Sequence, residues 1–237
     1  MYVANTDSTN TLMRQLIAEG KKPSYIYAGY QTAGRGQTGN GWESEADKNL
    51  LCSILLPPRE NLFELNVVVS VAVQRFVEKG CVIKWPNDIY WQDRKLAGIL
   101  IENALIGNQV KYSIAGIGLN VNQTEWLSNA PNPVSLKQIS GKEYNIDELM
   151  ERLYEEVQKA LAEDVWEYYK AHLYRKEGFW PFVEREVNIV PTMNASAQEQ
   201  GIFMARIENI LPTGEILLRD QQGQQRKYHF KQVRYVI

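Results

Sequence analysis

The spacing of apolar positions divides the chain into two parts of different character. In the first part, apolar residues recur at helical spacing in three segments, 9–20, 61–79 and 146–173. Short apolar runs bounded by turn residues predict strands at 25–30, 50–56, 81–84, 89–91, 96–102 and 110–121. Strands and helices that follow one another in this way predict an α+β domain over residues 1–182, a mixed β-sheet flanked by helices.

After residue 182 the helical spacing disappears. Short alternating runs, separated by turns rich in Pro, Gly and Gln, predict strands at 186–190, 202–210, 215–219 and 227–230. This pattern is typical of a small β-barrel. Residues 183–237 are therefore expected to form a second, all-β domain.

Composition narrows the class of protein. The 237 residues carry 26 Lys and Arg against 28 Asp and Glu, a net charge of −2, and this balance argues against a nucleic-acid partner. No apolar run is long enough to span a membrane, and the N-terminus lacks the basic and apolar segments of a signal peptide. Two cysteines are too few for a disulfide framework or a four-cysteine zinc site, so we expect a cytoplasmic protein.

A glycine-rich segment follows the strand predicted at 25–30. Residues 34–39 match the dinucleotide-binding pattern of glycines, but turn residues follow where that motif requires a helix, and no Gly-Lys-Ser/Thr completes a P-loop. Arg35 lies within the segment and Trp42 at its exit, an arrangement that indicates a flap that binds an anion. The alternative is an ordinary flexible surface loop, which the composition alone would favour.

Two further clusters lie on predicted strands. Residues 84–88 read Lys-Trp-Pro-Asn-Asp, and Lys95 stands at the start of an apolar strand, where an ammonium group can neutralise an anion in a partly desolvated pocket. The alternative is a solvated lysine after a charged turn. Residues 116–122 place two glycines and two asparagines in a strand, which marks either close approach of a ligand or a β-bulge.

The residue sets of common hydrolases and metalloenzymes are missing from the sequence. The two histidines, His172 and His229, have no metal-binding partner at a suitable spacing, and no Gly-x-Ser-x-Gly motif occurs. Any catalysis must therefore depend on cations and backbone amides, with or without a divalent metal.

Taken together, these clusters resemble the biotin–protein ligase family in order and spacing. The resemblance extends over the whole chain and includes Asp-Ser-Thr-Asn at 7–10, the two lysine motifs and Gly-Ile-Gly-Leu-Asn-Val-Asn at 116–122. It implies a catalytic domain of the class II synthetase-like, biotin/lipoate ligase type and an SH3-like C-terminal domain. Because the first motif begins at Asp7, we expect the short form of the family, without an N-terminal DNA-binding domain and without repressor function.

The resemblance also implies a reaction. Members of the family join biotin to ATP to give biotinyl-5′-AMP, with Mg²⁺, and then transfer biotin to a lysine of a biotin carboxyl carrier protein domain. A homodimer is left open. The alternative within the superfamily is a lipoate– or octanoate–protein ligase or transferase. A non-catalytic biotin sensor is a further alternative, but it would not need the two cations Arg35 and Lys95.

Site residues are carried over from the family by motif. Arg35 and Lys95 take the catalytic positions. The biotin-binding positions are Ser8, Thr9, Asn10, Gln31, Gly34, Arg35, Gly36, Gln37, Lys95 and Gly98. The ATP-binding positions are Trp42, Lys84, Asn87 and Asn120, and Asp88 is the candidate Mg²⁺ ligand. Gln37 departs from the family, whose members often have arginine there, so we expect weaker closure of the loop and faster loss of the adenylate.

Overall fold

The chain folds as two compact units. The computed structural model describes residues 1–37, 40–77, 80–107, 109–126, 132–185 and 199–237. One unit comprises Met1–Tyr169 and the other Lys170–Ile237, whereas the sequence placed the boundary between domains at 182/183. Residues just before that boundary pair within the second unit: Arg175 donates a hydrogen bond to the Val236 carbonyl at 2.8 Å.

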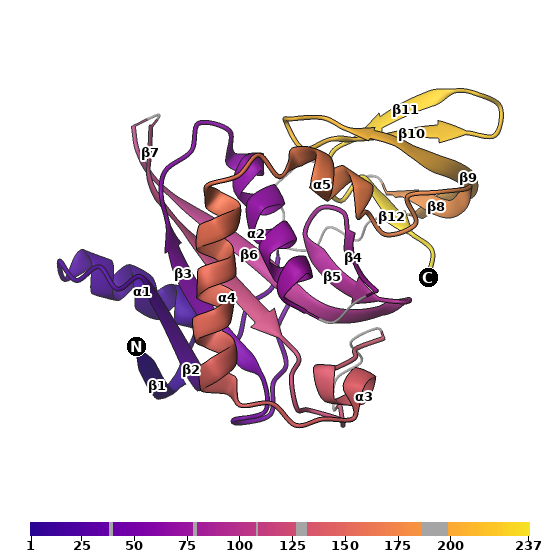
Figure 1. Cartoon of the computed structure of the whole chain (residues 1–237). Helices are drawn as coiled ribbons and strands as arrows, with labels where there is room; N and C mark the ends of the chain where they lie inside the picture. Colours follow the sequence, from indigo (N-terminus) through magenta and orange to yellow (C-terminus); the bar gives the residue numbers. More distant parts are fainter. Residues whose placement is uncertain (38–39, 78–79, 108, 127–131, 186–198) are drawn as a thin grey trace. The chain divides into compact units, whose positions relative to one another are not determined.

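A mixed seven-stranded sheet forms the centre of the first unit (Figure 1). Its strands are β1 (Tyr2–Thr6), β2 (Tyr25–Gln31), β3 (Leu50–Leu56), β4 (Cys81–Lys84), β5 (Asp88–Trp91), β6 (Arg94–Ile106) and β7 (Gln109–Leu119). They lie in the order β1-β2-β3-β7-β6-β5-β4. The edge strand β1 runs parallel to β2, and every other neighbouring pair is antiparallel. This arrangement confirms the predicted fold class.

Helices cover both faces of this sheet. The helices are α1 (Thr9–Ala18), α2 (Leu62–Phe76), α3 (Leu136–Ser140), α4 (Ile146–Leu161) and α5 (Trp166–Ala171). Met13 of α1 packs with Ile26 of β2, whereas the neighbouring Tyr27 bonds to Asp147 in the first turn of α4. Because successive strand residues point to opposite faces, α1 and α4 lie on opposite sides of the sheet.

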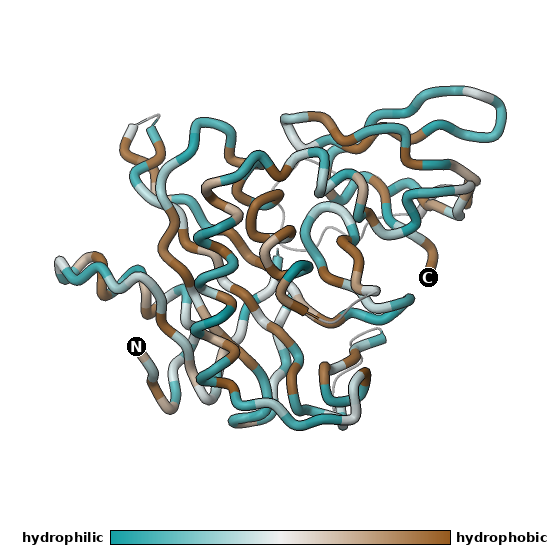
Figure 2. Tube along the Cα trace, in the orientation of Figure 1, coloured by the Kyte–Doolittle hydropathy of each residue, from teal (hydrophilic) through white to brown (hydrophobic). Residues whose placement is uncertain are grey.

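Helix α2 is buried all round because α4 packs over it. Its buried residues include every position from Val67 to Val73, so its apolar surface is much wider than a single stripe. Figure 2 shows the contrast: hydrophobic colour dominates α2, whereas α4 alternates between hydrophobic and hydrophilic. Asn61 caps the start of α2 by accepting a hydrogen bond from Phe63 N.

Three features of the first unit differ from the prediction. The helical stretch 146–173 is broken into α4 and α5, and Asp164 accepts a hydrogen bond from Trp166 N where the second helix begins. Strand β7 ends at Leu119, so Asn120 and Asn122 belong to the connection that follows it. Strand β1 and helix α3 were not predicted, because β1 is a mostly exposed edge strand without an apolar run and α3, with five residues, is too short to show a helical period.

The second unit contains a separate antiparallel sheet in the order β11-β10-β9-β8-β12, as expected of an SH3-like domain. Its strands are β8 (Trp180–Arg185), β9 (Glu199–Ile210), β10 (Ile216–Asp220), β11 (Gln225–Tyr228) and β12 (Val233–Tyr235). Aromatic rings fill its core, with Phe182 centred 4.8 Å from Tyr235. The strand predicted at 186–190 lies outside the described residues.

A polar cluster connects three strands of this second sheet, β9, β10 and β11. Gln225 and Arg219 donate hydrogen bonds to the carboxylate of Glu208, at 2.7 and 2.8 Å. These two hydrogen bonds hold the pKa of Glu208 below its usual range.

No helix in the described part of the chain is both long and apolar enough to cross a bilayer.

Candidate active site

The candidate site is built on a pair of glycines on the α1 side of the sheet. Gly98 of β6 and Gly118 of β7 are directly paired across the two strands. The indole ring of Trp42 lies flat against them: a Cβ atom at Gly118 would stand 2.4 Å from Trp42 Cε2, and one at Gly98 would stand 2.8 Å from Cζ3. Only glycine leaves room for a flat group this close to the backbone. We call Gly98 and Gly118 the glycine platform.

Lys95 places a cation at the edge of the glycine platform. Its ammonium lies 5.8 Å from the centre of a Trp42 ring and forms a 2.8 Å ion pair with Asp88 Oδ1. The backbone of Lys95 is held on both sides, because its N–H donates to the Asn132 carbonyl and its carbonyl accepts from Val134 N. Lys95 is only partly exposed, so its charge is less screened than on an open surface.

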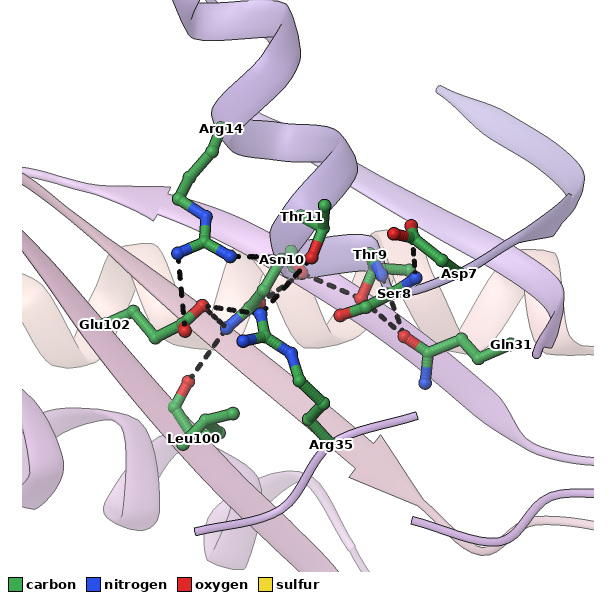
Figure 3. A network of polar contacts seen from close by, with 11 residues as sticks. Asp7, Ser8, Thr9, Asn10, Thr11, Arg14, Gln31, Arg35, Leu100 and Glu102 are labelled. Atoms are coloured by element: carbon green, nitrogen blue, oxygen red, sulfur yellow. Dashed lines mark hydrogen bonds and ion pairs between the residues drawn. The ribbon is translucent and has the colours of Figure 1, made fainter. Parts of the chain in front are cut away.

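Polar side chains from the first turn of α1 line the same face (Figure 3). Gln31 Oε1 accepts hydrogen bonds from both the backbone N–H of Thr9, at 2.8 Å, and its hydroxyl, at 3.2 Å. Ser53 Oγ lies 2.8 Å from Thr9 Oγ1 and 2.6 Å from Asn10 Oδ1. Because Gln31 Oε1 is occupied in this way, its amide nitrogen is directed away from α1 and toward the loop at Gly34.

Arg35 is held at the other side of this turn. Its Nη2 donates to Glu102 Oε2 and to Thr11 Oγ1, both at 3.3 Å. Glu102 Oε2 also accepts from Asn10 Nδ2 at 2.8 Å, and Arg14 lies 3.7 Å from Glu102 Oε1. The arginine that the sequence placed in a flap thus joins a charge cluster made by α1 and β6.

Gln37 makes neutral contacts instead of the charged ones an arginine would make. Its Nε2 donates to Asn87 Oδ1 at 3.0 Å. Asn87 is buried and donates to Asn66 Oδ1 on α2 at 2.7 Å. A chain of amides therefore connects the glycine-rich segment to α2.

Asn120 offers an unpaired acceptor near Lys95. Its Nδ2 donates to the carbonyls of Lys95 and Val134, at 3.3 and 3.0 Å. Its Oδ1 is buried and has no hydrogen-bond partner within the described residues. Since buried polar atoms are nearly always paired, this oxygen is available to a water molecule or a ligand.

The remaining predicted residues are placed as follows. Ser8 is buried at the N-cap of α1, and Asn10 uses both ends of its amide within the protein. Gly34 lies against the backbone of Trp42, and Gly36 N donates to the Asn40 carbonyl. Lys84 donates to the Tyr90 hydroxyl at 3.3 Å.

Several residues of the site were not found from the sequence. Ser53, Thr11 and Glu102 each contact predicted site residues, but their partners are distant in the chain or belong to an ordinary helical turn. A usable signal existed for Glu102, because it follows Gly98 and Leu100 at the two-residue period that puts all three on one face of β6.

A metal site made by the protein alone is not present in the described residues: no group of three or more His, Cys, Asp and Glu side chains gathers there. Asp88 contributes one carboxylate, which Lys95 engages. A single carboxylate is nevertheless a normal protein contribution to Mg²⁺, which usually takes most of its ligands from water and substrate phosphates.

A separate cavity of about 490 Å³ lies beside β2 and the start of α4. Its carboxylates are engaged by tyrosines, with Tyr2 donating to Asp47 at 3.4 Å and Tyr27 donating to Asp147 at 2.8 Å. Burial and the hydrogen bond to Asp147 raise the pKa of Tyr27 to about 12. This cavity adds no residue to the glycine platform.

Comparison with known proteins agrees with this geometry. The model of the biotin/lipoate A/B protein ligase family matches residues 2–120. The bifunctional ligase/repressor BirA of Escherichia coli is 28% identical over 234 residues, which cover 91% of this chain and 73% of that protein. A biotin–[acetyl-CoA-carboxylase] ligase of Paracoccus denitrificans is 28% identical over 94% of this chain and 95% of its own length.

Solved structures show the same fold. The biotin protein ligase of Aquifex aeolicus, solved in complex with biotin and ATP, superposes with a TM-score of 0.76 at 23% identity and covers 100% of this chain and 98% of that one. The family model covers half of the sequence and includes the glycine platform, Arg35 and Lys95. The chain belongs to the biotin/lipoate A/B protein ligase family.

Proposed function

We propose that the chain is an ATP-dependent biotin–protein ligase. The observation that carries the proposal is the Lys95 ammonium beside a glycine platform that Trp42 covers. Trp42 occupies the platform, so a flat ligand would stack on the outer face of the indole, and the cation beside it suits a ligand that carries a carboxylate or a phosphate. The biotin–protein ligases among the relatives support biotin and ATP as the substrates.

The first step joins two anions, which explains the need for cations. A carboxylate oxygen of biotin attacks the α-phosphorus of ATP, the bond to the β-phosphate oxygen breaks, and pyrophosphate leaves. Lys95 and Arg35 offset the repulsion between the carboxylate and the phosphate and hold the two groups at reacting distance. Fixed charges in a partly desolvated site stabilise the developing negative charge better than water does.

The second step transfers biotin to a protein. A lysine amine of a biotin carboxyl carrier protein domain attacks the carbonyl carbon of the adenylate, AMP leaves, and the amine gives up its proton. The glycine-rich segment, held by Arg35 and Gln37, shields the mixed anhydride from water until the carrier arrives.

The polar first turn of α1 suits the other end of biotin. The ureido ring has one carbonyl acceptor and two N–H donors. Ser8 offers its hydroxyl and Gln31 its Nε2, which is directed toward the loop, whereas Thr9 donates its N–H and hydroxyl to Gln31 Oε1 and so fixes the orientation of that amide. These three residues are proposed to bind the ureido head, whereas Asn10 supports them from beneath.

Trp42, Asn87, Asn120 and Lys84 are proposed to contact ATP. The buried, unpaired Asn120 Oδ1 supports a ligand on this side of Lys95. Asp88 is proposed to contact Mg²⁺, which would arrive with ATP and neutralise the charge of its phosphates.

Incubation with ATP, Mg²⁺, biotin and a purified carrier domain, followed by an avidin blot, tests the proposal. We expect biotin on the carrier, and its absence would refute the ligase function. Isothermal titration with biotin and with lipoate decides between the two substrate classes, since a preference for lipoate would support the alternative ligase. The expected lack of DNA binding stays a prediction, which a gel-shift assay checks.

A further inference from the structure

We propose that Glu102 is a positioning residue for Arg35. Its carboxylate holds the arginine of the glycine-rich segment against the first turn of α1 (Figure 3). The cation is thereby kept at a fixed position relative to the side chains proposed to bind the ureido ring. This inference rests on the proposed function, because it concerns how that site is assembled.

Three side chains from two separate segments converge on this carboxylate. Asn10 and Arg14 come from α1, and Arg35 comes from the segment after β2. Glu102 itself lies on β6, four residues after Gly98 and on the same face. A single carboxylate therefore connects the glycine platform, the helix and the loop.

The contact is shaped to orient Arg35 rather than to neutralise it. Among the residues that the structure describes, the Arg35 side chain donates two hydrogen bonds, to Glu102 and to Thr11, and both use Nη2. The N–H groups of Nη2 lie in the guanidinium plane, so two acceptors at that nitrogen orient the plane, and the remaining donors of the rigid fork can reach an anion. The side chain of Arg35 is 40% exposed, so an anion can reach it.

The local charge supports the same conclusion. Arg14, Arg35 and Glu102 together carry a net charge of +1, so the cluster still attracts an anionic substrate. Replacing Glu102 by glutamine would raise this charge to +2. Electrostatics alone would then tighten the binding of biotin and ATP, whereas loss of positioning would weaken it. The sign of the change separates the two explanations.

Kinetics of the intact protein provide the first test. In Glu102→Gln we expect the KM for biotin in pyrophosphate exchange to rise about 3- to 10-fold, the range for one partly exposed charged pair, with a smaller fall in kcat because Arg35 also holds the reacting groups. Glu102→Asp should recover part of the loss. Arg14→Gln is the matched control, because it removes a cation from the same carboxylate without touching the loop, and it should stay within about twofold of wild type.

Trypsin cleavage after Arg35, without any substrate, is the second test and does not depend on activity. The ion pair should protect this bond, so Glu102→Gln should be cut about 3- to 10-fold faster than wild type and Arg14→Gln should not. Equal cleavage of all three proteins, or a KM that falls in Glu102→Gln, would overturn the inference. If the wild-type protein formed no biotinyl-5′-AMP, the proposed function would be refuted. The rates of cleavage after Arg35 would still test whether Glu102 positions Arg35.

Discussion

A methyl group on the glycine platform should displace Trp42 and weaken substrate binding. In Gly118→Ala the new Cβ would stand 2.4 Å from Trp42 Cε2, 2.7 Å from Cζ2 and 2.8 Å from Cδ2. Contacts become ordinary at 3.4 Å, so the ring would have to move by about 1 Å away from the sheet. The backbone of β7 cannot yield instead, because it is paired on both sides.

The size of the effect follows from the cost of overpacking a buried contact. Such substitutions cost about 1–3 kcal/mol, which corresponds to a loss of roughly 5- to 150-fold in an equilibrium constant. We expect the Kd for biotin to rise about 5- to 150-fold, because the displaced indole moves about 1 Å into the space in which a ligand would bind. The free energy of unfolding should fall by a similar amount, since Trp42 also loses its packing in the free protein.

Isothermal titration and thermal melting measure the two quantities. Gly41→Ala is the matched control: it stands next to Trp42 in sequence, and its nearest neighbour would be 3.8 Å away, so binding should be unchanged. Gly118→Ala combined with Trp42→Ala should recover stability relative to the sum of the single changes, because the clash is gone. A folded Gly118→Ala protein that binds biotin as tightly as wild type would show that the ligand does not use this surface.

Three further outcomes are expected. Lys95→Ala should slow formation of biotinyl-5′-AMP at least about 100-fold. Lys111 is an exposed lysine on β7, so Lys111→Ala is the control and should have no effect. Full adenylation without Lys95 would refute its role. Gln37→Ala loses the hydrogen bond to Asn87 and should raise the rate of AMP release in the absence of carrier about fivefold. The prediction is contradicted if the variant still releases one AMP for each carrier that it biotinylates and none without carrier. The pKa of Glu208 is lowered in the folded protein, so its carboxylate stabilises the second unit above the unfolded pKa of 4.5, and this stabilisation is lost as the pH falls through the lower, folded pKa. In Glu208→Gln the melting temperature should therefore depend less on pH on the acid side. A pH profile of the melting temperature identical to that of wild type would contradict this role.

The residues of the platform and its cation stood out in the sequence because their signals are local, although a β-bulge and a solvated lysine were equally open interpretations and the pairing of Gly98 with Gly118 was not predicted. Two glycines at 116 and 118, a third at 98 and a lysine before an apolar strand are visible within short windows of sequence. Glycine inside a strand is costly, and its presence therefore points to a contact that only glycine permits. Strand β3 was likewise predicted with the bounds that the structure has, since a buried apolar run leaves little freedom.

Contacts between distant segments could not be predicted in this way. Glu102 is 67 residues from Arg35 and 92 residues from Asn10 in the sequence. The two-residue period of a strand shows which face Glu102 lies on, but it does not identify these partners. Ser53 reads as one more position of a buried strand, although its hydroxyl serves Thr9 and Asn10. The break after α4 was missed for a different reason. Asp164 is a good helix cap before Trp166, but the amphipathic pattern continues across it and therefore predicted one uninterrupted helix.

The pairing of Gly98 with Gly118 makes the assembly of the site depend on how β6 and β7 align during folding. A slip of one residue would place an isoleucine side chain, from Ile99 or Ile117, opposite a glycine and turn the platform into ordinary core. The irregularity of this hairpin lies between Ala104 and Leu105, near the turn and away from the glycines. An insertion there would be absorbed before it reached the site, so the tip of this hairpin is the place at which the chain could be lengthened or tagged without loss of the binding surface.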